Sequence, residues 1–260
     1  MNILYTKEDL IKFFKDLGIE SGMILEVHVS LKKFGHIIGG AQTFIDALLE
    51  VLGYNGTLIM ASQCSANSEP SYFEGLDFDQ YVRYRKNFPA FEQKESDTYE
   101  MGVVLDNLRR RDKTVCSQHP TLGFVAIGKY AKLLCNHQKL DFSLDETSPL
   151  GRLYELKAHC LLAGVDYNNM TSLHLCEYKS DVRPIIINGA AINENGQRVW
   201  KKYLDVQLDN SEFNKIGEIL EYRHLVNSAR LHNAECKLLR VDMAIDQGIE
   251  YFNKKHQFYH

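Results

Sequence analysis

Residues 24–60, ILEVHVSLKKFGHIIGGAQTFIDALLEVLGYNGTLIM, decide the class of fold. The apolar run Ile24–Val29 predicts a strand, and Leu58–Met60 predicts a second strand. Between these runs, one helical face collects the apolar residues Phe44, Ile45, Leu48, Leu49 and Leu52. A strand, a helix and a second strand in this order favour an α/β fold in which the two strands pair in parallel.

Similar patterns continue on both sides of this unit. Thr6 begins a helix that Gly18 ends. Leu161–Val165 predicts a buried strand, and a short helix follows that carries His174. Further helices are predicted over about 98–111, 128–134 and 242–252, and a hairpin joins strands at 185–187 and 199–206. No repeat or linker interrupts the pattern, so one domain over residues 1–260 is the simplest organisation.

Composition excludes several classes of protein. The chain has 260 residues, of which 45% are hydrophobic and 25% charged, and these values are typical of globular proteins. The formal net charge of −4 gives no basic field for nucleic acid. No apolar run of about 20 residues could span a membrane, and no signal peptide is visible, so a cytoplasmic protein is expected. The six cysteines form no CxxC pair, which favours reduced thiols over disulfides or a zinc site.

Residues 64–100 form a long polar and aromatic segment with no clear periodicity. Long loops inside compact domains are uncommon and often functional. Acidic residues outnumber basic ones in this stretch, so it could line a cleft for a cationic substrate. A solvated loop would have the same composition, and the sequence leaves both interpretations open.

His174 and Glu177 are the strongest candidates for catalysis. Residues three apart lie on one face of a helix, so the carboxylate can orient the imidazole. A neutral imidazole can take a proton from a nucleophile, and the carboxylate then stabilises the imidazolium. From spacing alone, a surface His–Glu pair without function is the commoner outcome.

Two further stretches could bind a ligand. His28 to Gly40 ends in Gly39-Gly40 before a helix, so free amides and the positive end of the helix dipole could meet phosphates. The stretch has no Walker lysine and no complete GxGxxG, and a plain tight turn is the alternative. His119 precedes Pro120, which restricts its backbone to extended values, and it could equally be a packed loop residue.

Together, four blocks of sequence resemble the aminoglycoside 3-N-acetyltransferase family, which is distinct from the GNAT acetyltransferases. The first block is VHVSLKKFGHIIGG (27–40) with GTLIM (56–60), and the second is FPAF (88–91) with MG (101–102). The third is SQHPTLGFVAIG (117–128). The fourth and most specific is SPLGRLYEL (148–156), LLAGV (161–165) and TSLHLCEY (171–178). In order and spacing the blocks cover nearly the whole chain.

The resemblance implies an α/β domain with a mixed central sheet flanked by helices, and residues 64–100 as an inserted substrate-side loop. It implies acetyl-coenzyme A as cosubstrate, no metal, and His174 as general base oriented by Glu177. The residues expected to bind coenzyme A are His28, Ser30, Leu31, Gly39, Gly40, Ser117, His119 and Phe124. The expected partner is a small cationic amine, most directly the 3-amino group of a 2-deoxystreptamine aminoglycoside. Neither nucleic acid nor membrane is expected as a partner, and the protein would be a monomer or homodimer.

The sequence departs from the family pattern around the acceptor. The departures are at Ala61, Ser62, Asp97, Gly123, Asp166 and Met170. Three acids, Asp145, Glu146 and Asp166, are candidates for holding a cationic amine. Another amine or aminosugar is therefore an alternative acceptor. A His/Glu hydrolase is a further alternative, although no GxSxG motif is present, as is a coenzyme A-binding protein without turnover.

Overall fold

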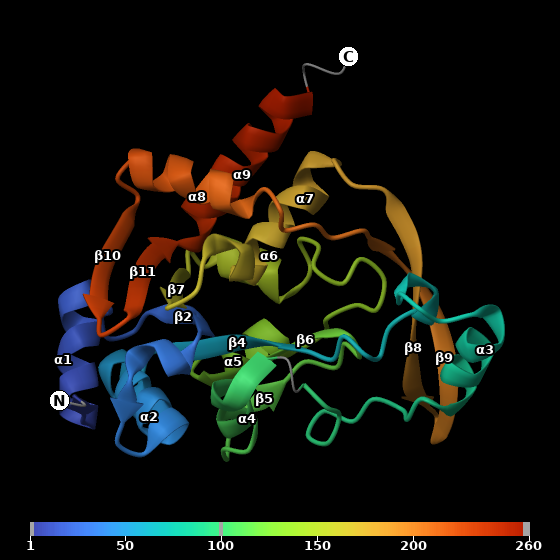
Figure 1. Cartoon of the computed structure of the whole chain (residues 1–260), viewed down its shortest axis with the longest axis horizontal. Helices are drawn as coiled ribbons and strands as arrows, with labels where there is room; N and C mark the ends of the chain where they lie inside the picture. Colours follow the sequence, from blue (N-terminus) through green and yellow to red (C-terminus); the bar gives the residue numbers. More distant parts are fainter. Residues whose placement is uncertain (1–2, 99–100, 257–260) are drawn as a thin grey trace.

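A seven-stranded mixed sheet forms the centre of this computed structural model, which describes residues 3–98 and 101–256 (Figure 1). The strand order is β10 (Val226–Leu231), β11 (Ala234–Arg240), β7 (His159–Ala163), β2 (Ile24–Val29), β4 (Thr57–Gln63), β6 (Leu122–Gly128) and β5 (Val115–Cys116). β2 pairs in parallel with both β4 and β7, and the remaining pairs are antiparallel. The predicted α/β class, with the first two long strands in parallel, is confirmed.

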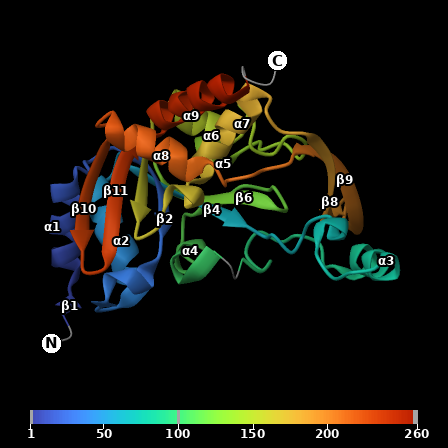
Figure 2. The same cartoon turned by 45° about the horizontal axis from the view of Figure 1, so that its top comes forward.

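Helices cover both faces of this sheet (Figure 2). Leu25 and Val27 of β2 pack on the layer formed by α1 (Lys7–Leu17), α2 (Gly40–Leu52) and α4 (Gly102–Arg109). The other face carries α5 (Ala131–Cys135), α6 (Pro149–Glu155), α7 (His174–Ser180), α8 (Phe213–Tyr222) and α9 (Val241–His256). Side chains alternate along a strand, so Glu26 and His28 point from β2 toward this second layer.

The helix ends follow the chemistry of the sequence. Thr6 and Asp9 form a capping box at the start of α1, and Gly18 ends the helix in the left-handed region at φ 107°. α2 begins differently, because Gly39 precedes it at φ 82° and no side chain caps its first turn. The first amides of α2 therefore remain available to other acceptors.

A long hairpin stands apart from the central sheet, beside the segment that follows β4 (Figure 1). It consists of β8 (Ile185–Glu194) and β9 (Gln197–Val206). The turn uses Asn195 and Gly196 with φ of 55° and 80°, values that a two-residue hairpin turn favours. The predicted hairpin is confirmed, with longer strands than the sequence indicated.

Residues 64–98 are attached to this hairpin by backbone contacts. The side chain of Asn67 donates to the carbonyl of Ala191 at 3.1 Å and accepts the amide of Ala191 at 2.8 Å. The segment contains a short 3₁₀ turn, η2 (Pro70–Tyr72), and the helix α3 (Phe78–Asn87). The expectation of an irregular segment was therefore wrong in part, since α3 is a regular helix, although it buries none of its residues.

Other elements complete the description. Two short strands, β1 (Leu4–Tyr5) and β3 (His36–Ile37), pair in parallel, and 3₁₀ turns occupy η1 (Leu31–Phe34), η4 (Tyr167–Asn169) and η5 (Thr171–Leu173). The helix expected over 98–111 is shorter, and residues 99–100 lie outside the described part. The helix expected over 128–134 begins only at Ala131. Within the described ranges, no helix is long and apolar enough to cross a membrane.

Candidate active site

The candidate active site is a cavity of about 260 Å³ at the carboxyl ends of β2, β4 and β7. Open α/β sheets bind ligands at this edge, where loops leave neighbouring parallel strands. The lining residues are Val27, His28, Val29, Met60, Ala61, Gln63, Met101, Val165, Asn168, Asn169, Thr171, His174 and Asn210. Histidines from two different elements, β2 and α7, thus meet in one cavity.

His174 is the first residue of α7, and its side chain is held from one side. Nδ1 lies 2.6 Å from Oε2 of Glu177, one helical turn further along. The ring also packs edge-on against Phe213, with 4.9 Å between the ring centroids. The side chain keeps 13% of its surface exposed, enough for a substrate to reach it. The predicted pairing of His174 with Glu177 on one helical face is present in the structure.

Glu177 is buried, and its second oxygen is also occupied. Oε1 accepts a hydrogen bond from Nε of Arg183 at 2.6 Å and from the amide of Asp209 at 3.1 Å. Arg183 also reaches Asp209 itself, at 3.1 Å between Nη1 and Oδ2. A carboxylate with a cationic partner can stay ionised when buried. An ionised Glu177 favours the tautomer of His174 with its hydrogen on Nδ1, in which Nε2 is the basic nitrogen.

A second carboxylate–histidine pair lies behind the same cavity. Nε2 of His28 is 3.1 Å from Oε1 of Glu26, which is completely buried. Together with Cys160 these residues place three potential metal ligands within 4.8 Å of one another. Burial and the nearby Glu26 raise the pKa of the Cys160 thiol well above its ordinary value, which disfavours the thiolate that metals bind. We therefore interpret the group as a hydrogen-bonding cluster.

The stretch predicted to meet phosphates continues directly from the cavity. Ser30 follows β2 and donates its amide to Ala163 of β7 at 3.0 Å, and Leu31 begins the turn η1. The stretch ends at Gly39 and Gly40, where the uncapped first turn of α2 begins. The φ of 82° at Gly39 disfavours any side chain there, and a Cβ would also require the hydroxyl of Thr43, 2.3 Å away, to move. This arrangement is compatible with a phosphate-bearing ligand.

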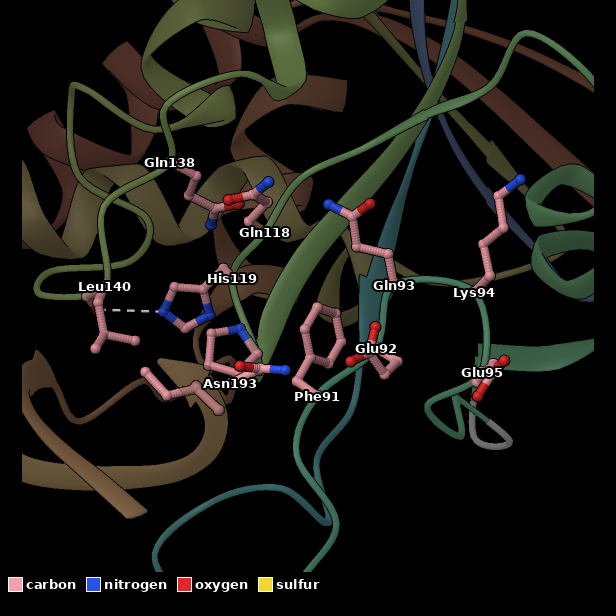
Figure 3. Close-up of a pocket in the computed structure, with 12 residues that line it drawn as sticks. Phe91, Glu92, Gln93, Lys94, Glu95, Gln118, His119, Gln138, Leu140 and Asn193 are labelled. Carbon is pink, nitrogen blue, oxygen red and sulfur yellow. Dashed lines mark hydrogen bonds between the residues drawn. The ribbon is translucent and has the colours of Figure 1, made fainter. Parts of the chain in front are cut away.

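The third predicted block lies elsewhere. Phe124 and Ser117 are buried, and Oγ of Ser117 accepts the amide of Phe124 at 2.8 Å. His119 lines a larger cavity of about 730 Å³, together with Phe91, Gln118 and other residues (Figure 3). Neither Ser117, His119 nor Phe124 lines the cavity that contains His174. Their contact with coenzyme A stays a prediction.

The ring of His119 is fully engaged with the backbone. Nδ1 accepts the amides of Thr121 at 3.2 Å and Leu122 at 2.9 Å, and Nε2 faces the carbonyl of Leu140 at 3.1 Å (Figure 3). Burial lowers the pKa of His119 to about 4, although the bond to Leu140 opposes this. These contacts favour the packed-residue interpretation, and the larger cavity lacks a histidine free to act as a base among the described residues that line it.

The three candidate acids for binding an amine lie outside the cavity lining. Asp145 accepts both the amide and the hydroxyl of Thr147 at 2.7 Å, so it caps its own turn. Glu146 pairs with Lys179 on the surface. Asp166 is exposed and precedes the turn η4. The polar groups that the described lining offers are instead the amides of Gln63, Asn168, Asn169 and Asn210.

One departure from the family pattern lines the cavity, and others lie outside its lining. Ala61 lines the cavity, whereas Met170 is completely buried. Gly123 is tightly enclosed, because a Cβ would lie 3.1 Å from the backbone oxygen of Ser62 and 3.2 Å from that of His119. Ala61 is thus the departure that changes the cavity surface directly.

Sequence reasoning missed the residues that support Glu177. Arg183 and Asp209 lie beyond the helix and after the hairpin, and neither follows a spacing rule that links it to His174. Phe213 belongs to α8, whose apolar spacing Phe213, Ile216, Gly217 and Leu220 could have revealed the helix. Its contact with the imidazole follows only from the tertiary fold.

Comparisons with known proteins agree with the fold and identify the family. The family model for aminoglycoside 3-N-acetyltransferase matches residues 27–253. The SPbeta prophage-derived aminoglycoside N(3')-acetyltransferase-like protein YokD of Bacillus subtilis (strain 168) is 33% identical over 250 residues, covering 95% of this chain and 92% of YokD. Aminoglycoside N(3)-acetyltransferase IX of Micromonospora chalcea is 33% identical over 203 residues, covering 76% and 71% of the two chains.

Solved structures give the same result. The crystal structure of YokD has a TM-score of 0.93 at 32% identity, and the match covers 96% of this chain and 94% of that one. A mutant of the aminoglycoside acetyltransferase AAC(3)-IVa, solved in complex with a gentamicin, has a TM-score of 0.82 at 25% identity, with 98% and 90% covered. This chain is therefore an acyltransferase of the aminoglycoside N(3)-acetyltransferase type and belongs to the aminoglycoside 3-N-acetyltransferase family.

Proposed function

We propose that the protein transfers the acetyl group of acetyl-coenzyme A to an amine, most directly the 3-amino group of a 2-deoxystreptamine aminoglycoside. His174 is the general base, and Glu177 orients it. One observation carries this assignment: the 2.6 Å contact of Nδ1 with a carboxylate that Arg183 also holds, in a residue that lines the cavity. The relatives named as aminoglycoside N(3)-acetyltransferases, and the gentamicin complex of AAC(3)-IVa, support the acceptor class.

The chemical step uses the free nitrogen of His174. The amine nitrogen forms a bond to the thioester carbon while Nε2 takes its proton, and the carbonyl electron pair moves onto oxygen. The carbonyl then re-forms, the carbon–sulfur bond breaks, and the leaving thiolate can take the proton from His174. A positioned base typically contributes about 100- to 10,000-fold. None of these steps requires a metal, so we propose catalysis without one.

The cosubstrate would approach along the stretch from His28 to Gly40. Its thioester would lie in the cavity, and its phosphates would face the uncapped start of α2. Residues 64–98 would form the acceptor side, because Phe91 to Glu95 line the larger cavity beside the hairpin. The chain would then act as a single acetyltransferase domain over residues 1–260.

A non-antibiotic amine or aminosugar is the second candidate acceptor. The observation that favours it is the cavity lining, which includes the amides of Gln63, Asn168, Asn169 and Asn210 but no acidic side chain of the described residues. Cationic antibiotics with several ammonium groups are usually held by carboxylates. The reaction would be the same with either acceptor.

Thiol release tests the proposal directly. The purified protein is mixed with acetyl-coenzyme A and a panel of aminoglycosides and aminosugars, and free coenzyme A is followed. We expect release with a 2-deoxystreptamine drug, and a loss of about 100-fold or more in His174→Ala. His224→Asn serves as the matched control, since His224 is exposed and asparagine tolerates its positive φ of 55°.

The outcomes separate the candidates. Release with an aminosugar but no drug would replace the antibiotic acceptor and keep the mechanism. An unchanged rate in His174→Ala would remove His174 from catalysis. No release with any amine, despite binding of coenzyme A, would refute the assignment of turnover.

A further inference from the structure

His28 and Glu26 form a second His–Glu pair in the same cavity wall as His174. Both belong to β2, two residues apart, so they point to the same face of the sheet. His28 lines the cavity, and Glu26 lies one pleat deeper and is completely buried. The two pairs approach the cavity from different elements: one from the central strand and one from the start of α7.

Among the described residues, His28 is the group placed to balance the negative charge of Glu26. Its side chain makes no ion pair with a lysine or arginine within residues 3–98 and 101–256, and His28 is its ion-pair partner at 3.1 Å. Neither carboxylate oxygen has a hydrogen bond of good geometry, although Ser172 and Cys160 lie nearby. Burial raises the pKa of Glu26, but the charge and nearby donor of His28, together with Ser172 and Cys160, outweigh it and bring the pKa below its ordinary value. His28 is therefore the main compensating group of Glu26 among the described residues.

This requirement limits where the hydrogens of His28 can be. Two arrangements give the Glu26–His28 pair no net charge. In the first, protonated Glu26 donates to Nε2 of a neutral ring. In the other, a charged ring donates from Nε2 to an ionised Glu26. Both arrangements put a hydrogen on Nδ1. A neutral ring with its hydrogen on Nε2 would lose the bond that the amide of Thr171 donates to Nε2 at 3.3 Å, and it would also leave an ionised Glu26 without a balancing charge.

Nδ1 is thus a donor that the protein does not use. Nε2 makes both contacts of His28, to Glu26 and to Thr171, and Nδ1 has no hydrogen-bond partner among the residues that the structure describes. The ring nevertheless lines the cavity, which offers this donor to a bound ligand. The strand that carries His28 is paired with β7 at this residue and with β4 up to Glu26, so the backbone that positions the donor belongs to the central sheet.

We propose that His28 is a second catalytic residue, which donates its Nδ1 hydrogen to the carbonyl oxygen of the thioester while His174 takes the proton of the amine. This role rests on the proposed function. As the carbon–nitrogen bond forms, the carbonyl electron pair moves onto oxygen, and the hydrogen bond from Nδ1 strengthens. The pair returns when the carbon–sulfur bond breaks, and His28 neither gains nor loses a proton overall. Glu26 is a positioning residue that fixes the ring.

Two substitutions of His28 by amide residues distinguish the roles of its two ring nitrogens. In His28→Asn the amide nitrogen can stand near the position of Nδ1, whereas in His28→Gln the amide reaches toward the position of Nε2. We expect His28→Gln to lower kcat about 100- to 1,000-fold, the usual effect of losing one oxyanion donor. His28→Asn should keep kcat within about tenfold of the wild type because one donor remains. Coenzyme A affinity, measured by calorimetry, should stay nearly constant in both.

The experiment also separates failure of this inference from failure of the proposed function. Wild-type turnover with equal kcat in His28→Gln and His28→Asn would overturn the role of Nδ1 but keep acetyl transfer. A loss confined to the KM of acetyl-coenzyme A would make His28 a binding residue and would equally overturn it. Absence of wild-type turnover would refute the proposed function instead.

A measurement on the wild-type protein avoids any folding defect of the variants. Long-range ¹H–¹⁵N spectra of protein labelled at histidine report which ring nitrogen carries a hydrogen. We expect hydrogen on Nδ1 of His28, with His28→Asn identifying its signals. A bare Nδ1 would overturn the proposal, whatever the kinetics of the variants.

Discussion

The two His–Glu pairs differ in what stands behind each carboxylate. Glu177 is shared between His174 and Arg183, with 2.6 Å to each, so a cation other than the histidine balances its charge. Glu26 has His28 as its ion-pair partner and no arginine or lysine within the described ranges. We therefore propose that the first histidine acts as the base and that the second presents a hydrogen. On this proposal the same residue types have opposite roles because of one arginine.

The pairs also differ in which nitrogen meets the carboxylate. Glu177 contacts Nδ1 of His174 and leaves Nε2 free, whereas Glu26 contacts Nε2 of His28 and leaves Nδ1 free. Both free nitrogens belong to residues of one cavity. A base and a donor in one cavity are what amine attack on a thioester needs, since charge develops on the nitrogen and on the oxygen.

The largest expected effect comes from removing the charge of the first pair. Glu177→Gln should lower kcat about 1,000-fold, because the amide no longer fixes the hydrogen on Nδ1 or stabilises the imidazolium. Coenzyme A affinity should change far less, and calorimetry beside thiol release checks both. Glu218→Gln, an exposed glutamate of α8, is the matched control. Full turnover in Glu177→Gln would remove Glu177 from the mechanism.

Removing the guanidinium of Arg183 tests whether this cation distinguishes the two His–Glu pairs. Arg183→Met leaves the buried carboxylate of Glu177 without its cationic partner. This should lower the free energy of unfolding, measured in urea, by about 3 kcal/mol. In a Glu177→Gln background the same substitution should cost clearly less, since no charge is left unbalanced. Equal losses in the two backgrounds would mean that Arg183 does not compensate Glu177.

His119 provides a buried histidine without any carboxylate partner among the described residues. Its pKa of about 4 lies below the value of about 6.5 in the unfolded chain, so the folded state favours the neutral ring. Stability from this group is complete above pH 6.5 and is lost as the pH falls toward 4, by about 3 kcal/mol at most. His119→Asn can still accept the amides of Thr121 and Leu122 and should flatten this part of the profile. An unchanged profile in the variant would assign the acid sensitivity to other groups.

The smallest effects are expected from the acids outside the cavity. Asp145→Asn and Glu146→Gln should change kcat/KM for an aminoglycoside less than about threefold, because screened surface charges act weakly at a distance. Asp145 caps a turn, and Glu146 already pairs with Lys179. A tenfold loss would place the acceptor against these acids and enlarge the site beyond the cavity.

The spacing of apolar residues and the turn residues predicted the elements that depend on short stretches of sequence. The strand–helix–strand unit of residues 24–60 and the hairpin at Asn195-Gly196 formed as expected. The spacing of His174 and Glu177 gave their contact, and the family resemblance gave it a function. Helix α3 was not predicted because no residue in it is buried, so it carries no apolar stripe.

The tertiary parts of the site were beyond local reasoning. Arg183 and Asp209 reach Glu177 only because the chain returns to α7 after the hairpin. His28 was predicted as a contact of coenzyme A, but its pairing with Glu26 depends on a buried carboxylate at a strand position that favours apolar residues. The sequence did contain a usable signal, because a glutamate stands inside an apolar strand pattern two residues before a histidine.

We infer that Glu177, held by Arg183, keeps the hydrogen of His174 on Nδ1 and leaves Nε2 without a hydrogen. Long-range ¹H–¹⁵N spectra of the histidine-labelled protein at neutral pH, with coenzyme A bound, test this most directly, and His174→Ala identifies the signals. We expect a hydrogen on Nδ1 of His174 and none on Nε2. A hydrogen found on Nε2 would contradict it, because His174 could then not accept the proton of the amine.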